Sequence, residues 1–135
     1  MDIKTTFLHG NLEEQIFMKV PDGVELKNAD SKACLLKKSL YGLKQSPRQW
    51  YKRFDIFMMS VGFQRSKYDS CIYQTGDSNT CVLYLLLYVD DILIAGKSRE
   101  LIEEVKKTLN KEFEMKDLGY AKRILGMDIH RSTDL

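Results

Sequence analysis

The chain has 135 residues, of which 44% are hydrophobic and 30% charged, and its formal net charge is +2. This length suffices for one domain at most, with a real core, and the composition is that of an ordinary soluble globular protein. No secretory signal opens the sequence, and its apolar runs are too short to span a bilayer. Three cysteines without metal-ligand spacing fit reduced thiols. We therefore expect an intracellular, cytoplasmic protein without a membrane segment.

The first third of the chain predicts short elements. Residues 3–20 carry apolar groups around a polar centre, which predicts a tight turn or short helix and then a strand over 15–20. Pro21-Asp22-Gly23 is a turn signal, residues 24–32 are expected to form a surface loop, and residues 33–37 a strand.

A helix is predicted to start at Ser46-Pro47, with the hydroxyl as N-cap and proline at the first helical position, and to stop at Gly62. Its apolar stripe is Trp50, Phe54, Phe57, Met58 and Val61. Residues 31–54 also carry seven cations and no acid: Lys32, Lys37, Lys38, Lys44, Arg48, Lys52 and Arg53. These cations could contact nucleic acid or a triphosphate, or could simply be solvated.

The most informative segment is an apolar run interrupted by two acids. Residues 81–89 lead straight into Asp90-Asp91, and apolar character resumes over 92–96. Buried ionised carboxylates are costly unless they are paired or bind a cation. We therefore expect an antiparallel hairpin whose turn presents both acids to a metal ion, although an ordinary aspartate-rich turn would also fit. A strand over 70–74 and a turn over 76–79 precede this hairpin.

The last third predicts one helix and one strand. Ser98 caps a helix whose apolar face is Leu101, Ile102, Val105, Leu109 and Phe113, and residues 122–130 alternate as a strand. The order of these elements indicates an α+β fold, with the helices packed on one face of an antiparallel sheet.

Metal-dependent nucleotidyl transfer needs carboxylates from separate parts of the chain that converge on two metal ions. An adjacent pair cannot hold both ions well, so a third acid is required, and Asp2 is the candidate. Asp2 is followed five residues later by an aromatic side chain, Phe7.

Five segments resemble, in order and spacing, the reverse transcriptase of Ty1/copia-type LTR retrotransposons. They are DIKTTFLHGNLEEQIFM (2–18), LKKSLYGLKQSPRQWYKRF (36–54), YLLLYVDDILIAGK (84–97), FEMKDLG (113–119) and ILGMDI (124–129). The resemblance implies a ferredoxin-like polymerase palm over residues 1–135. It also implies an RNA-directed DNA polymerase, a nucleotidyltransferase that uses two Mg²⁺ or Mn²⁺ ions to extend a primer 3′-hydroxyl.

The resemblance also assigns roles to single residues. Asp2, Asp90 and Asp91 resemble the catalytic, metal-binding aspartates, and the carbonyl of Ile3 an additional ligand. In the resemblance Asp90 would be the metal ligand shared with Asp2, and Asp91 the accessory carboxylate. Phe7 resembles the residue that excludes a 2′-hydroxyl.

Further positions resemble nucleotide and nucleic-acid contacts. Tyr41, Gly42 and Gln45 lie in the segment that packs against the nucleotide. Lys44 and Arg48 could reach phosphates, and Leu125-Gly126-Met127 resembles the turn that positions the primer end. Lys116 could give a proton to pyrophosphate, although a solvated surface lysine is the simpler interpretation.

The family's polymerase is longer than this chain. We expect fingers, thumb and RNase H to be absent, and the 135-residue polypeptide alone to have little or no polymerase activity. The partners implied are a primed RNA or DNA template, a dNTP and the rest of the Pol polyprotein, inside a virus-like particle of the parent element. The alternative is a catalytically inactive retrotransposon remnant with at most weak nucleic-acid binding.

Overall fold

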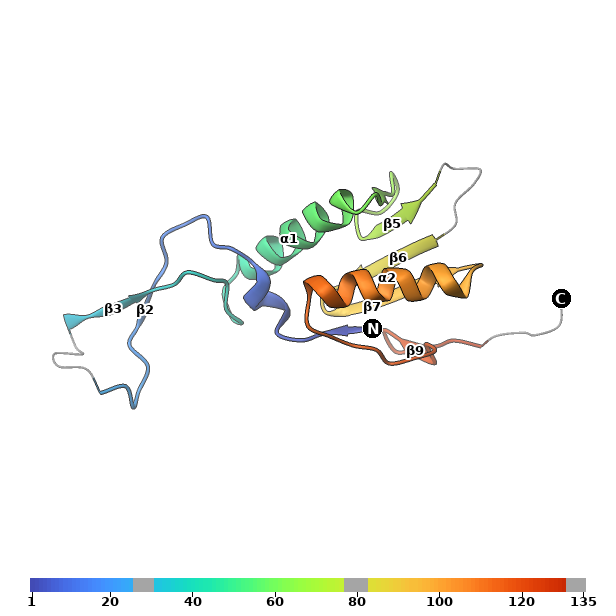
Figure 1. Cartoon of the computed structure of the whole chain (residues 1–135). Helices are drawn as coiled ribbons and strands as arrows, with labels where there is room; N and C mark the ends of the chain where they lie inside the picture. The colour runs from blue at the N-terminus through green and yellow to red at the C-terminus, as the bar shows by residue number, and fades with distance from the viewer. Residues whose placement is uncertain (26–30, 77–82, 131–135) are drawn as a thin grey trace. The chain divides into compact units, whose positions relative to one another are not determined.

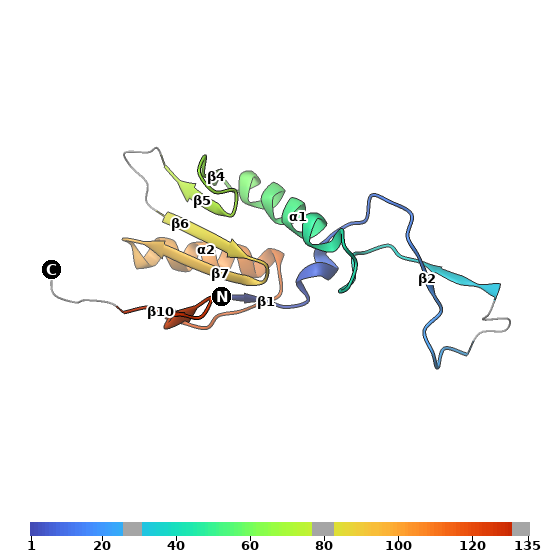
Figure 2. The same cartoon turned by 180° about the vertical axis from the view of Figure 1, so that it is seen from behind.

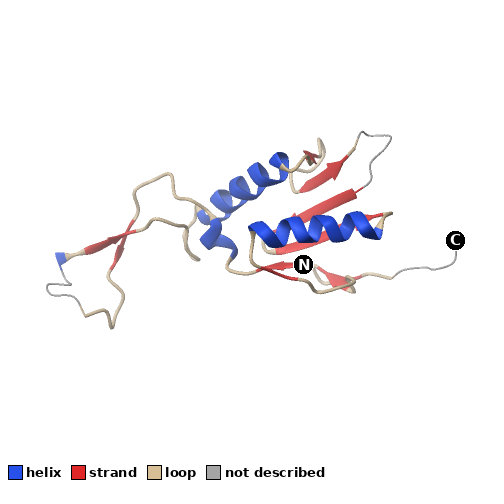
Figure 3. Ribbon diagram, in the orientation of Figure 1, coloured by secondary structure: helices blue, strands red, loops and turns tan. Residues whose placement is uncertain are grey.

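The computed structural model of the chain describes residues 1–25, 31–76 and 83–130. It confirms the predicted α+β class: the described residues form antiparallel strands and two α-helices (Figure 3). The chain divides into two compact units. Unit 1 comprises residues 1–4 and 62–135, and unit 2 comprises residues 5–61. Among the described residues, no helix combines the length and the hydropathy that crossing a membrane requires.

Unit 1 is built on a six-stranded antiparallel sheet in the order β4-β5-β6-β7-β1-β8. Its strands are β1 (Asp2–Ile3), β4 (Gln64–Arg65), β5 (Ile72–Thr75), β6 (Leu83–Tyr88), β7 (Asp91–Gly96) and β8 (Met115–Lys116). A separate hairpin, β9 (Arg123–Ile124) with β10 (Met127–Asp128), follows in the chain. The first strand of the sequence thus lies beside β7, and the paired residues Asp2 and Asp91 are 89 positions apart.

The β6–β7 hairpin confirms the strand pair predicted around the two acids. Its register pairs Leu83 with Gly96 and Tyr88 with Asp91. Leu85 and its neighbours two residues away on β6 are buried, whereas Tyr84 and Tyr88 are exposed. Because side chains alternate between the two faces of a strand, one face of this sheet belongs to the core and the other is open.

Helix α2 (Arg99–Glu112) packs against β7 and covers the core face, as the two opposite views show (Figures 1 and 2). Its predicted N-cap is confirmed, because the Ser98 side chain accepts a hydrogen bond from the Leu101 amide at 3.3 Å. Leu109 and Phe113, from the predicted apolar stripe, are almost completely buried. The helix therefore stabilises the strand that begins with Asp91.

Unit 2 contains a 3₁₀ helix η1 (Thr6–His9), strands β2 (Phe17–Lys19) and β3 (Ala33–Leu35), and helix α1 (Ser46–Ser60). Helix η1 packs on α1, and His9 lies 5.8 Å from the Trp50 ring. Gly10 is required here, because a Cβ at this position would lie 2.9 Å from Ser39 Oγ and 3.1 Å from the Trp50 amide nitrogen.

Two expectations about local structure were wrong. Ser46 does not cap α1: its hydroxyl donates to the Leu40 carbonyl at 2.6 Å, and Gln45 occupies the N-cap position. Residues 122–130 form the β9–β10 hairpin instead of one strand, because both Leu125 and Gly126 adopt positive φ and reverse the chain. The turn predicted over 76–79 lies outside the described residues after Gly76.

Candidate active site

The register of β1 places Asp2 directly opposite Asp91. Met1 and Ile92 exchange backbone hydrogen bonds of 2.7 and 2.8 Å, and the Ile3 amide donates to the Asp90 carbonyl at 2.9 Å. Asp2 and Asp91 lie between these bonds and form the intervening pair. In such a pair the Cα atoms lie about 4.5 Å apart and the side chains share one face of the sheet. Two carboxylates from distant parts of the sequence are thereby neighbours.

Asp90 lies in the two-residue turn that joins β6 to β7, next to this pair. The turn begins with Val89 at a φ of 55°. A positive φ is unusual for a β-branched residue, and hairpin turns generally use glycine, asparagine or aspartate where it is needed. Strained backbone of this kind clusters at functional sites.

Asp2 and Asp91 occupy the open face of the sheet, which they share with Tyr88. The pairing of Tyr88 with Asp91, and of Asp91 with Asp2, places the three side chains on one face. Tyr88 is 53% exposed, and Asp2 and Asp91 are partly exposed. A ligand can therefore reach these carboxylates from solvent.

Lys116 extends the row of paired residues formed by Asp91 and Asp2. It lies opposite Asp2 on β8, so the sequence acid–acid–cation runs across β7, β1 and β8. The other acids near β8 contact different cations: Glu114 contacts Lys4 at 2.6 Å, and Asp117 contacts Lys106 at 3.0 Å. Among the described residues, no ion pair engages Lys116, which is exposed.

Carboxylate oxygens on adjacent strands are ligands that Mg²⁺ and Mn²⁺ accept. Their like charges are destabilising when they face each other without a cation. The pair formed by Asp2 and Asp91 therefore fits a divalent ion. Within the described residues, however, no three His, Cys, Asp or Glu side chains are grouped closely enough to hold a metal ion. Asp90, the third predicted acid, lies next to this pair, because its backbone carbonyl accepts the Ile3 amide.

The predicted nucleotide residues lie in unit 2. The rings of Phe7 and Tyr41 are in contact, with centroids 4.8 Å apart, and Tyr41 is 60% exposed. Gly42 has a φ of 93°, which only glycine adopts readily, so the chain turns directly after Tyr41. Gln45 donates to Glu14 at 3.4 Å. Phe7, Tyr41 and Gly42 thus form one aromatic surface patch.

The predicted nucleic-acid contacts are also on the surface. Lys44 and Arg48 are exposed in unit 2, at the start of α1. Lys52, one helical turn after Arg48, forms an ion pair with Glu13. In unit 1, Leu125 and Gly126 form the turn of the β9–β10 hairpin, and Leu125 and Met127 are 47% and 61% exposed. Apolar side chains at the tip of a two-stranded hairpin are available to a partner.

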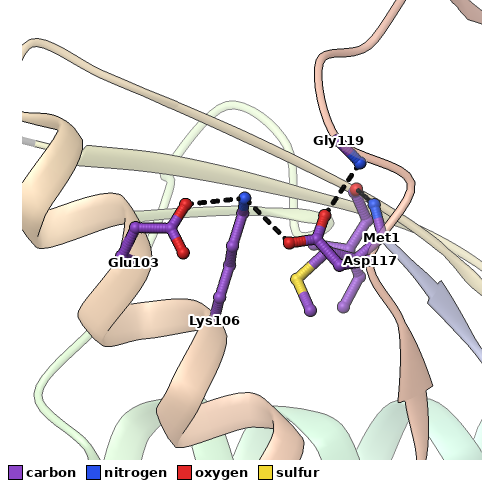
Figure 4. A network of polar contacts seen from close by, with 6 residues as sticks. Met1, Glu103, Lys106, Asp117 and Gly119 are labelled. Carbon is purple, nitrogen blue, oxygen red and sulfur yellow. Dashed lines mark hydrogen bonds and ion pairs between the residues drawn. The ribbon is translucent and has the colours of Figure 1, made fainter.

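The network around Lys106 was not predicted from the sequence. Lys106 Nζ lies 2.9 Å from Glu103 Oε1 and 3.0 Å from Asp117 Oδ2 (Figure 4). The Gly119 amide and the Lys106 ammonium hold the pKa of Asp117 below its usual value. The sequence signal was limited to the helical spacing of Glu103 and Lys106, which is common on solvated helices.

Residues 1–135 match the family model described as reverse transcriptase (RNA-dependent DNA polymerase). The retrovirus-related Pol polyprotein from transposon TNT 1-94 of Nicotiana tabacum is 52% identical over 131 residues, which are 97% of this chain and 10% of that protein. The corresponding polyprotein from transposon RE1 of Arabidopsis thaliana is 35% identical over 133 residues, 97% of this chain and 9% of that protein.

A yeast protein is similar over almost the whole chain as well. The putative transposon Ty5-1 protein of Saccharomyces cerevisiae is 34% identical over 134 residues, which are 99% of this chain and 43% of that protein. The chain thus spans about a tenth of the plant relatives and less than half of the yeast one. No solved structure matches it. The chain belongs to the reverse transcriptase family of Ty1/copia-type retrotransposon Pol polyproteins.

Proposed function

We propose that this chain carries the metal-binding aspartates of an RNA-directed DNA polymerase and takes part in nucleotidyl transfer to a primer 3′-hydroxyl. The observation that carries the proposal is the β1–β7 register, which pairs Asp2 with Asp91 and joins Ile3 to Asp90. Family membership supports the same reaction class. Fingers, thumb and RNase H would be supplied by the rest of the Pol polyprotein.

In this proposal the aspartates act as oxygen ligands. Asp2 and Asp91 extend from neighbouring strands on the open face, and Asp90 joins them from the turn, with the Ile3 carbonyl as an additional ligand. Two divalent ions, when bound, lower the pKa of the primer 3′-hydroxyl and neutralise charge on the triphosphate and the leaving pyrophosphate. Lys116, opposite Asp2, adds a positive charge at the same face and could give a proton to pyrophosphate.

Unit 2 would contribute selectivity for the nucleotide. The Phe7 ring contacts the Tyr41 ring, and this contact would restrain it beneath a bound sugar. A restrained ring beneath a sugar leaves no room for a 2′-hydroxyl, which favours a deoxynucleotide. Gly42 would allow the backbone to approach the nucleotide, and Gln45 would lie beside it. Lys44 and Arg48 would contact phosphates of the template or primer, and Leu125-Gly126-Met127 the primer end.

The experiment that tests the metal site is calorimetric titration of Mn²⁺ into the purified chain, compared with Asp2→Asn, Asp90→Asn and Asp91→Asn. Glu104→Gln removes the same charge from the exposed surface of α2 and serves as the control. We expect binding in the parent chain and the control, and its loss in the three aspartate variants. Absence of Mn²⁺ binding in the parent chain would refute the proposal and favour the inactive remnant.

The experiment that tests the nucleotide patch compares Mn²⁺-dependent binding of dATP and ATP by the parent chain and Phe7→Val. We expect the parent chain to prefer dATP and the variant to lose that preference, because valine leaves space for the 2′-hydroxyl. Phe17→Val makes the same change at a residue of unit 2 that is 62% exposed, and should keep the preference. Equal binding of both nucleotides by the parent chain would refute this role of Phe7.

A further inference from the structure

Asp2 lies on a very short strand, in which the neighbouring Ile3 side chain is almost completely buried. Strand β1 has two residues, and its outer neighbour β8 also has two. So few backbone hydrogen bonds cannot by themselves hold an edge strand in one register. A metal ligand, however, must be placed to within a fraction of an ångström. Other contacts must therefore hold β8 against β1 if Asp2 is to be positioned.

Two side-chain contacts flank β8. At one end, Lys4 pairs with Glu114 at 2.6 Å, but their side chains are 53% and 66% exposed. Pairs as exposed as this contribute little. At the other end, Lys106 is 17% exposed and contacts both Glu103 and Asp117, whose side chains are 47% and 41% exposed. Because water screens Lys106 less, its contact with Asp117 is the stronger restraint.

Asp117 joins three parts of unit 1. Its Oδ2 atom lies 3.0 Å from Lys106 on α2, and its Oδ1 atom accepts the Gly119 amide at 2.9 Å. Through the backbone it follows Lys116, the residue opposite Asp2. Helix α2 in turn packs on β7, the strand that begins with Asp91. The contact of Lys106 with Asp117 (Figure 4) thus joins α2, which packs on β7, to the residue that follows β8, which pairs with β1.

We infer that Lys106 and Asp117 are positioning residues for the metal site, which hold β8 against β1 and thereby fix Asp2 opposite Asp91. The inference rests on the proposed function, because it concerns the site that Asp2 and Asp91 would form. Neither residue touches the metal or the substrate. Their effect is transmitted through the β1–β8 pairing.

The test compares Asp117→Asn with Glu103→Gln. Both variants remove one negative charge from Lys106, and only Asp117 is attached to β8. Asparagine keeps the oxygen that accepts the Gly119 amide. The first readout is hydrogen exchange of the Ile3 and Lys4 amides, which donate to the Asp90 and Glu114 carbonyls. The second is the affinity for Mn²⁺, and urea unfolding reports the stability of the whole chain.

In Asp117→Asn we expect exchange of these two amides to quicken about tenfold, the loss expected for one charge-assisted hydrogen bond. Mn²⁺ binding should weaken by a similar factor. Glu103→Gln should leave both readouts close to the parent values. Lys106→Gln removes the same contact from the helix side and should show the same faster exchange as Asp117→Asn. Lys106→Arg keeps the charge and should keep most of the parent chain's protection from exchange.

Equal behaviour of Asp117→Asn and Glu103→Gln, or unchanged exchange at Ile3 and Lys4, would overturn the inference. A uniform rise in exchange across unit 1 would likewise overturn it, because the network would then be a general stabiliser. If the parent chain binds no Mn²⁺, the proposed function fails, and the exchange data still decide whether Asp117 holds β1.

Discussion

Without a metal ion, the opposed carboxylates should destabilise unit 1. Asp2 and Asp91 face each other across β1 and β7, and like charges in that arrangement cost roughly 0.2–1 kcal/mol. Asp91→Asn removes one charge with little change in shape. We therefore expect this variant, in EDTA, to be more stable than the parent chain by about 0.5 kcal/mol, measured as the free energy of unfolding in urea.

A divalent ion should reverse this order. A ligand that binds only the folded state stabilises it by RT ln(1 + [L]/Kd), which is about 1.4 kcal/mol when the ion is present at ten times its Kd. The parent chain should gain this amount in Mg²⁺, whereas Asp91→Asn should gain little. The parent chain would then be the more stable of the two by about 1 kcal/mol.

The informative result is that Asp91→Asn is more stable than the parent chain in EDTA and less stable than it in Mg²⁺. Glu104→Gln, which removes a charge from an exposed helix position, should follow the parent chain in both solutions. If Asp91→Asn is less stable than the parent chain in EDTA, the two carboxylates do not repel each other as argued. Equal gains in Mg²⁺ for the parent chain and Asp91→Asn would show that the ion binds elsewhere.

Three further changes test other parts of unit 1. Leu85→Ala removes a side chain that is 0% exposed in the β6 core, and should cost about 2–5 kcal/mol in urea unfolding; a loss below 1 kcal/mol would mean that the site is loosely packed. Val89→Asn relieves a φ of 55° at the hairpin turn and should raise stability by about 0.5–1 kcal/mol, whereas a loss would contradict backbone strain there. Because the pKa of Asp117 is lowered in the folded chain, its contribution to stability is present above the usual value of 3.8 and is lost as the pH falls through the lowered pKa. The urea midpoint of Asp117→Asn should therefore change less than that of the parent chain when the pH falls below about 4, and an identical pH dependence would refute this role.

Long periodic segments could be predicted from the sequence, and short ones could not. The β6–β7 hairpin and α2 bury one face each, so their apolar residues repeat at intervals that reveal the element. Strands β1, β4 and β8 have two residues each, which is too short for any repeat. Their place in the sheet is decided by tertiary pairing, which a single sequence does not display.

Some residues of the candidate site could likewise be predicted from the sequence, and others could not. Asp90-Asp91 could be found because two acids in an apolar run contradict the burial around them. Asp2 could be named only because the chemistry needs a third acid, and its register with Asp91 could not be predicted. Lys106 and Asp117 gave no usable signal, since charged residues on an amphipathic helix and in a loop are ordinarily solvated. Their contact depends on how α2 packs.

The shortness of β1 links assembly of the site to binding of the metal. Pairing Asp2 with Asp91 costs repulsion, which the hydrogen bonds of Met1 and Ile3 to β7 and the burial of the Ile3 side chain oppose. An ion held by both carboxylates would remove the repulsion and add attraction across the same two strands. Metal binding and β1 pairing therefore favour each other, and each must strengthen the other by the same factor. A contact that holds β8 in place, such as Lys106 with Asp117, acts on this shared equilibrium without touching the ion.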